Sequence, residues 1–135
     1  KFKPQLPRPM AHDDAKAMIN TAELQTTDGW TGTRDTAVIT LLYGCGLRIS
    51  EALGLNRSSA PLPESLGIRG KGGKDRIVPV LPVARRAVDA YLAECPYPLE
   101  DDHPLFIGVR GKRLNARHIQ KVMEQWRFLF QRLNS

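Results

Sequence analysis

An arginine and two lysines occupy positions from which their side chains can act on a phosphodiester. Arg48 lies two residues after Gly46, where one helical pattern ends and another begins. Lys71 and Lys74 belong to the glycine-rich segment 70–75, between two stretches that predict β-strands. A guanidinium offers a planar fork to two phosphate oxygens. A lysine on a glycine-rich loop can approach a ligand closely and donate a proton.

Each of these residues also has an ordinary structural interpretation. Arg48 could be a surface arginine, or it could pair with Glu51 in a structural bridge. Lys71 and Lys74 could belong to a solvated, flexible turn. A nucleotide-binding P-loop fits poorly, because it requires glycine five residues before Gly-Lys-Ser/Thr and Ile68 holds that position here.

Positive charge is concentrated in two stretches of the chain. Twenty Lys and Arg residues exceed fourteen Asp and Glu residues, which gives a net charge of +6. Residues 69–76 and 110–121 are rich in Lys and Arg, whereas acidic residues gather elsewhere, as at 100–102. The second stretch leads into an expected helix start, where backbone N–H groups also favour an anion. Such segregation predicts a positive face, for which phosphate is a common partner.

Other kinds of chemistry find little support in the sequence. His12 and His103 are isolated, and His118 begins a His-Ile-Gln-Lys sequence that resembles a His-x-x-Arg pair only superficially. Cys45 and Cys95 show no metal-ligand spacing and are expected to be free thiols, so we expect no metal site and no cofactor. Tyrosines 43 and 91 lie on apolar stripes and are expected in the core.

The length of 135 residues indicates one domain of α+β class, mainly helical with one small antiparallel sheet. No apolar run approaches the length of a membrane span. The chain begins with Lys1, so we expect it to be a piece of a longer protein.

The pattern predicts a linker at 1–10, helices at 11–24, 33–43 and 50–55 (the last capped by Ser50), strands at 66–69 and 76–80, a helix from 82 that ends before Pro96, and a final helix capped by Asn115.

These segments together resemble the catalytic domain of the tyrosine recombinases, the phage integrase family, and most closely its bacterial Xer branch. The resemblance runs from about Pro9 to Trp126. It rests on Gly46-Leu47-Arg48-Ile49-Ser50-Glu51-Ala52-Leu53, on the hairpin from Gly70 to Val80, and on Leu105-Phe106 followed by Arg113-Leu114. The first two motifs are specific when they occur in this order and spacing.

The resemblance implies a role for each matching residue. Arg48 would be the first of two arginines that stabilise the pentavalent phosphorane, and Lys71 would protonate the leaving 5′ oxygen. Glu51 would support Arg48, and a tyrosine nucleophile would form a 3′-phosphotyrosyl bond without ATP or metal. The basic residues expected to contact double-stranded DNA are Arg69, Lys74, Arg76, Arg110, Lys112, Arg113 and Arg117.

The chain departs from the family pattern. It has no match to the family's His-x-x-Arg pair, to its later His or Trp, or to its nucleophilic Tyr, and no tyrosine follows Tyr97. We therefore expect residues 11–135 to form a partial catalytic domain that cannot cleave DNA alone. The Xer likeness implies resolution of chromosome dimers in the bacterial cytoplasm, with a related recombinase subunit in a tetrameric synapse. Three alternatives stay open: a mobile-element integrase, a non-catalytic DNA-binding module and a basic protein-interaction domain.

Overall fold

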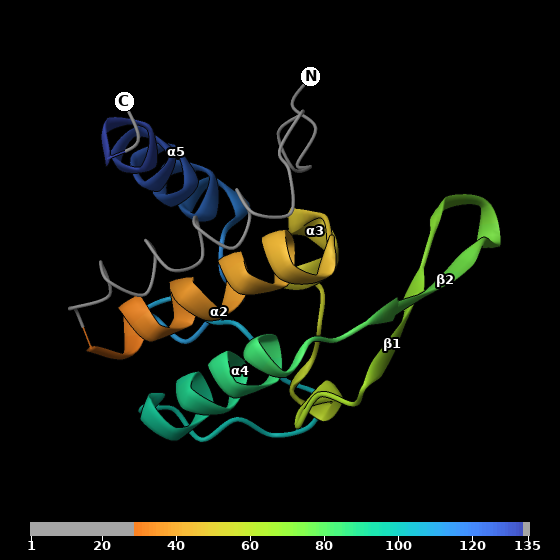
Figure 1. Ribbon diagram of the computed structural model, residues 1–135. Helices are drawn as coiled ribbons and strands as arrows, with labels where there is room; N and C mark the ends of the chain where they lie inside the picture. The colour runs from red at the N-terminus through yellow and green to blue at the C-terminus, as the bar shows by residue number, and fades with distance from the viewer. Residues whose placement is uncertain (1–28, 134–135) are drawn as a thin grey trace.

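The computed structural model describes residues 29–133, with Lys71, Phe130 and Leu133 described through their backbone alone. Helices and a two-stranded sheet make up this part of the chain (Figure 1), which confirms the predicted fold class. The predicted linker at 1–10 and helix at 11–24 lie outside the described residues. The elements are α2 (Gly29–Cys45), α3 (Ile49–Leu53), a 3-10 turn (Arg57–Ser59), β1 (Ser65–Arg69), a second 3-10 turn (Lys71–Gly73), β2 (Asp75–Pro79), α4 (Pro82–Glu94) and α5 (Ala116–Leu133).

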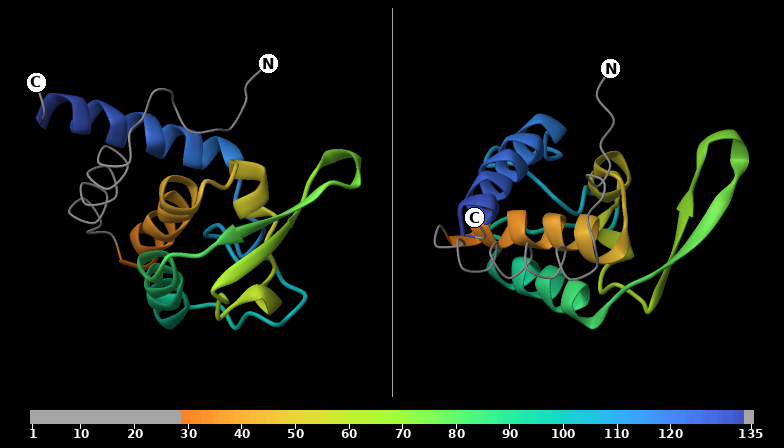
Figure 2. Two further views of the ribbon diagram at one scale, coloured as in Figure 1. Left: turned by 45° about the vertical axis from the view of Figure 1, so that its right-hand side comes forward. Right: turned by 45° about the horizontal axis from the view of Figure 1, so that its top comes forward.

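Helix α2 is the central helix of the described fold. Every residue from Arg34 to Tyr43 is buried, because α4 packs along the helix and α3 and α5 contact it elsewhere (Figures 1 and 2). The helix begins at Gly29, earlier than the predicted residue 33. The ring of Trp30 packs edge-on against Tyr97 at 6.0 Å and also lies 5.5 Å from the Arg34 guanidinium. These contacts hold a first turn that the polar sequence alone does not predict.

The expected burial of Tyr43 and Tyr91 is confirmed, since they are 6% and 0% exposed. Tyr91 of α4 is fully buried, and its hydroxyl donates to the Leu105 carbonyl at 2.8 Å while accepting the Ile107 N–H. This burial raises the pKa of the Tyr91 phenol. Asn115 caps α5 as predicted, since its side-chain oxygen accepts the Arg117 N–H at 2.7 Å. Among the side chains of α5 that the structure describes, the buried ones are Ile119, Val122, Met123 and Trp126.

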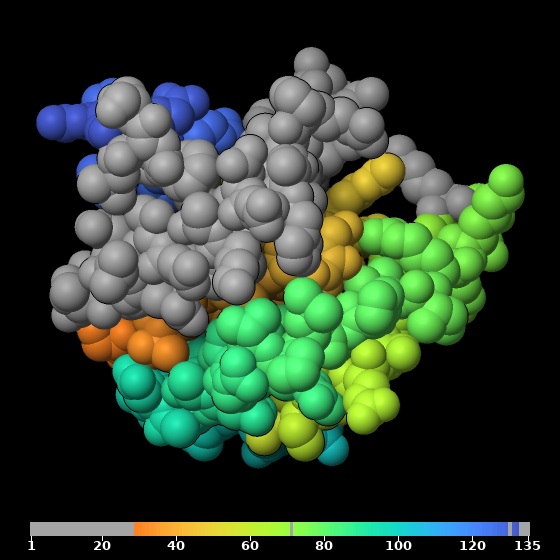
Figure 3. Space-filling view, viewed as in Figure 1, coloured from red at the N-terminus to blue at the C-terminus, as the bar shows by residue number. Residues whose placement is uncertain are grey.

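The two strands form an antiparallel hairpin that projects from the helices as an arm (Figures 1 and 3). Its register runs from Ser65 opposite Pro79 to Arg69 opposite Asp75, close to the predicted strands. Side chains alternate between the two faces of the hairpin. Residues 66, 68 and 78 are buried toward the helices, whereas Ile77 on the other face is 73% exposed. The hairpin is therefore anchored at its base while its tip stands in solvent.

Candidate functional site

Arg48 occupies the N-terminal cap position of α3. Its backbone is extended, with φ −78° and ψ 157°, and its side chain is exposed and makes no hydrogen bond or ion pair with the rest of the described chain. The Arg48 N–H donates to Glu51 Oε1 at 2.9 Å, which is the acidic half of a capping box. The prediction that Ser50 caps this helix is wrong, because α3 begins one residue earlier and uses the Glu51 carboxylate. The cap fixes the backbone of Arg48 and leaves its guanidinium free for a ligand.

Gly46 turns the chain from α2 into this cap. Its φ is +74°, a left-handed conformation that ends the helix at low steric cost only for glycine. Its N–H donates to the Leu42 carbonyl at 3.1 Å, and the Leu47 N–H donates to the Leu41 carbonyl. The reversal buries Leu47 and directs the next side chain, Arg48, outward.

Arg76, on strand β2 of the hairpin, binds the same Glu51 carboxylate. Its Nη1 donates to Oε2 at 2.7 Å and its Nη2 donates to Oε1 at 2.8 Å, a bidentate ion pair. Nη2 also lies 3.5 Å from the carbonyl oxygen of Gly46. The bonds from Arg76, opposed by partial burial and aided by the Arg48 N–H, lower the pKa of the Glu51 carboxyl. The sequence predicted that Arg76 contacts DNA. The structure shows in addition an ion pair with Glu51 that the sequence did not predict.

We expect the stabilising effect of Glu51 to depend on pH. Because its pKa is lowered on folding, its contribution is complete above the ordinary glutamate pKa of about 4.3 and is lost as the pH falls through the lower folded value. The difference in unfolding free energy between the unchanged chain and Glu51→Gln should therefore shrink on acidification. Urea unfolding at several pH values measures this free-energy difference. Glu124→Gln, at an exposed position, is the charge-matched control. A Glu51→Gln difference that stays constant from neutral to strongly acidic pH contradicts this assignment.

The hairpin tip carries Lys71 where sequence analysis expected it. The backbone of Lys71 opens the 3-10 turn between β1 and β2, and the Gly70 N–H donates to the Lys74 carbonyl at 2.8 Å. A Cβ built on Gly70 would lie 2.2 Å from that carbonyl oxygen. The tight closure of the turn thus requires glycine at position 70.

Gly70→Ala should open the tip, because the new methyl group cannot coexist with the Lys74 carbonyl. We expect a loss of about 1–3 kcal/mol of stability, the usual effect of overpacking, and faster amide exchange through residues 70–74. Hydrogen–deuterium exchange measures the second effect directly. Gly67→Ala is the control, since a Cβ there meets nothing within 4 Å. Equal protection of the tip in both variants would contradict the close contact.

Basic side chains lie on three structures next to α3. Arg69 and Lys74 are exposed on the hairpin, and the N-terminal end of α5 lies beside α3 (Figure 2). Arg110 and Lys112 are exposed on the loop before α5, and Arg117 is exposed on α5 itself. These five and Arg48 make no ion pair with an acidic residue of the described chain.

The Arg113 guanidinium instead makes hydrogen bonds within the fold. Its Nη1 donates to the carbonyl oxygens of Leu53, at 2.5 Å, and Leu55, and its Nη2 donates to Asn56 Oδ1 at 2.9 Å. It thereby satisfies carbonyls at the end of α3 and fixes the loop before α5 against that helix. A contact between Arg113 and DNA stays a prediction.

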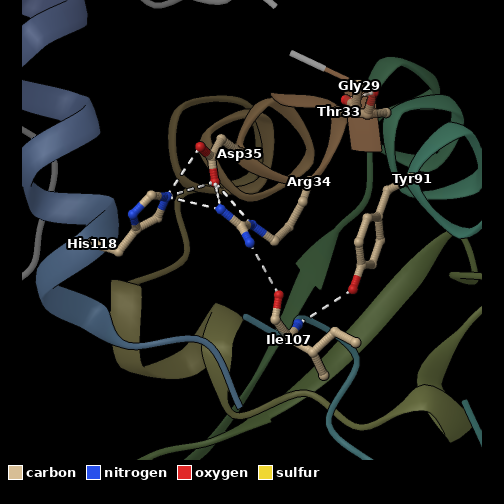
Figure 4. Close-up of polar contacts among 7 residues, drawn as sticks. All are labelled: Gly29, Thr33, Arg34, Asp35, Tyr91, Ile107 and His118. Carbon is tan, nitrogen blue, oxygen red and sulfur yellow. Dashed lines mark hydrogen bonds and ion pairs between the residues drawn. The ribbon is translucent and has the colours of Figure 1, made fainter. Parts of the chain in front are cut away.

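A buried polar network missed by sequence analysis joins α2 to α5 (Figure 4). Arg34, 2% exposed, donates through Nε to Asp35 Oδ1 at 3.0 Å and through Nη1 to the Ile107 carbonyl at 3.2 Å. His118 Nε2 lies 2.9 Å from Arg34 Nη2 and 3.1 Å from Asp35 Oδ2. The available signal was the adjacent pair Arg34-Asp35 at the start of an apolar helical stripe, where charges must be paired.

Two further findings bear on other functions. Among residues 29–133, no helix is long and apolar enough to cross a membrane. Glu100, Asp102 and His103 bring possible ligand atoms within 4.8 Å of one another, but all three are exposed. His103 Nδ1 already accepts the Glu100 N–H, so the cluster is explained as a solvated loop.

Comparison with known sequences decides the family. The model of the Phage integrase family matches residues 8–131, most of the chain. The chain belongs to the phage integrase family. This confirms the family suggested by the Arg48 turn and the glycine–lysine hairpin.

Curated relatives place this family member near the Xer recombinases. It is 49% identical to tyrosine recombinase XerC of Rhodospirillum centenum, over 96% of this chain and 38% of the relative. It is 46% identical to XerC of Brucella suis, over 90% of this chain and 39% of the relative. The structure resembles the crystal structure of XerA recombinase with a TM-score of 0.67 and 25% identity, covering 90% of this chain and 42% of that one. The chain thus spans about two fifths of these proteins.

Proposed function

We propose that the protein carrying this chain is a site-specific tyrosine recombinase that cleaves and rejoins DNA through a 3′-phosphotyrosine intermediate. The observation that carries the proposal is the exposed Arg48 guanidinium on a backbone fixed by Glu51, next to the hairpin that bears Lys71. The similarity to XerC proteins from several bacteria supports it.

The roles follow from the charge changes of phosphoryl transfer. Negative charge grows on the non-bridging oxygens in the transition state, and the Arg48 fork can stabilise it by two hydrogen bonds. The leaving 5′ oxygen needs a proton, which Lys71 supplies from the hairpin. Glu51 acts on Arg48 through the backbone. The nucleophilic tyrosine and the second arginine would be contributed by the remainder of the full-length protein.

The proposed partner is double-stranded DNA, bound through the unpaired cations next to α3. Arg69, Lys74, Arg110, Lys112 and Arg117 would contact phosphates, which fixes the register of the duplex without reading its sequence. We further propose assembly with a related recombinase subunit in a tetrameric synapse, in the cytoplasm. Resolution of chromosome dimers is the favoured role because the relatives are XerC proteins; the alternative is a mobile-element integrase.

Covalent trapping tests this function. The full-length protein is incubated with nicked duplexes carrying its own recombination site, and protein–DNA adducts are resolved under denaturing conditions. We expect an adduct with the full-length protein and none with the 135-residue chain alone. Salt-dependent binding without an adduct would instead indicate a non-catalytic DNA-binding module. Absent or salt-insensitive binding would indicate a protein-interaction domain, because phosphate contacts weaken steeply with salt.

A further inference from the structure

We propose that Arg76 is a positioning residue that holds the Lys71 hairpin against the Arg48 turn. This inference rests on the proposed function and extends it to Arg76, a residue to which that function assigns no step of the chemistry. The bidentate bond to Glu51 joins β2 to the helix that begins after Arg48. Arg76 thus connects the elements that carry the two groups acting on the phosphodiester.

Strand geometry explains why Arg76 points toward α3. Arg76 lies opposite Ile68 in the antiparallel register and two residues before Val78. Residues two apart on a strand share a face, and both Ile68 and Val78 are buried, at 5% exposed. The Arg76 side chain therefore emerges on the core side of the hairpin, beyond the last buried pair.

The ion pair acts where apolar packing between hairpin and helix is incomplete. A hollow of about 320 Å³ lies between α3 and β1, lined by Ser50, Gly54 and Gly67 among others. Within the described chain, the side-chain hydrogen bonds that connect the hairpin strands to the helical body are those of Arg76 to Glu51 and Gly46. Without them, the hairpin would pivot more freely about its buried base.

The fork geometry predicts that lysine cannot replace Arg76. Two guanidinium nitrogens meet two carboxylate oxygens at 2.7 and 2.8 Å, which fixes orientation as well as distance. An ammonium group is a single charge centre and leaves the hairpin free to rotate about one contact. Because Lys71 lies only five residues before Arg76, such rotation would displace it directly.

The defect expected on losing Arg76 is specific to proton donation. The Arg48 N–H still binds Glu51 when Arg76 is replaced, so the Arg48 turn keeps its cap. The Lys71 hairpin, in contrast, loses its side-chain attachment to α3. An Arg76 variant should therefore behave like a Lys71 variant rather than like an Arg48 variant.

A substrate with sulfur in place of the 5′ bridging oxygen separates these behaviours, because a thiolate leaves without being protonated. In the full-length protein we expect Arg76→Lys and Arg76→Ala to slow cleavage of the ordinary phosphodiester about 10- to 100-fold. A loss of that size is usual when a catalytic group, here Lys71, is displaced by a small distance. On the sulfur substrate both variants and Lys71→Ala should cleave nearly as fast as the unchanged protein. Arg48→Ala should remain slow. Arg86→Lys, an exposed arginine on α4, controls for a general effect of the substitution.

Two results would overturn the proposal: full cleavage of the ordinary substrate by both Arg76 variants, or an equal loss on both substrates. If the unchanged protein forms no adduct, the proposed function fails, and a spectroscopic readout decides the positioning claim separately. Spin labels at Asp75→Cys and Asp89→Cys, with Cys45 and Cys95 changed to serine, report the distance from the tip end of the hairpin to α4. Arg76→Ala should broaden that distribution; an unchanged distribution contradicts the positioning role.

Discussion

Arg48→Ala in the full-length protein should cleave DNA about 100- to 1000-fold more slowly than the unchanged protein, the usual effect of removing one donor to a developing oxyanion. The side chain is exposed and unpaired within residues 29–133, so its removal breaks no hydrogen bond or ion pair there. The backbone N–H that caps α3 is retained. The loss should therefore appear in the rate of the chemical step and not in stability.

Single-turnover cleavage of nicked duplexes, with protein in excess, measures that rate. Arg86→Ala removes the same charge from the exposed side of α4 and serves as the control. Arg48→Lys should recover only part of the activity, because an ammonium group cannot present a planar fork to two oxygens. Cleavage by Arg48→Ala at the unchanged rate would remove Arg48 from the active site.

Arg34→Met should lower the free energy of unfolding by about 3–5 kcal/mol, the scale for breaking a buried ion pair. The substitution leaves Asp35 buried without its guanidinium partner and the Ile107 carbonyl without its donor. The interface between α2 and α5 should suffer most, since His118 reaches this pair from α5 (Figure 4).

The double variant Arg34→Met with Asp35→Leu distinguishes a pairing effect from a packing effect. If the Asp35 carboxylate left without its guanidinium causes most of the loss, removing it as well should restore part of the stability, although His118 then loses its contact with Asp35. Urea unfolding of the 135-residue chain measures both variants. A double variant less stable than Arg34→Met alone would contradict this explanation.

Local sequence signals were sufficient for the hairpin and for most helix limits. Glycines around Lys71, flanked by strand-forming residues, predicted a hairpin, and Pro82 and Asn115 marked two helix starts. The inward direction of Arg76 also follows from the strand period, since it shares a face with Val78. Its partner does not follow, because Glu51 lies 25 residues away and on another element.

Contacts between distant segments explain what the sequence did not predict. The adjacent charges Arg34 and Asp35 indicate a buried pair, but His118 lies more than 80 positions away, so no local signal identifies it as their partner. Arg113 was assigned to DNA because it lies in a basic run, yet its guanidinium binds carbonyl oxygens at the end of α3. Charge density indicates a positive region, whereas the tertiary fold decides which cations remain unpaired.

The most direct test of the account replaces one non-bridging oxygen of the scissile phosphate with a methyl group, which removes its negative charge. If Arg48 acts by stabilising that charge, it has little left to stabilise on the neutral substrate. We predict that the rate ratio between unchanged protein and Arg48→Ala falls from about 100- to 1000-fold on the phosphodiester to less than about tenfold on the methylphosphonate. An undiminished ratio would contradict the claim that this turn supplies phosphate stabilisation to a recombinase active site.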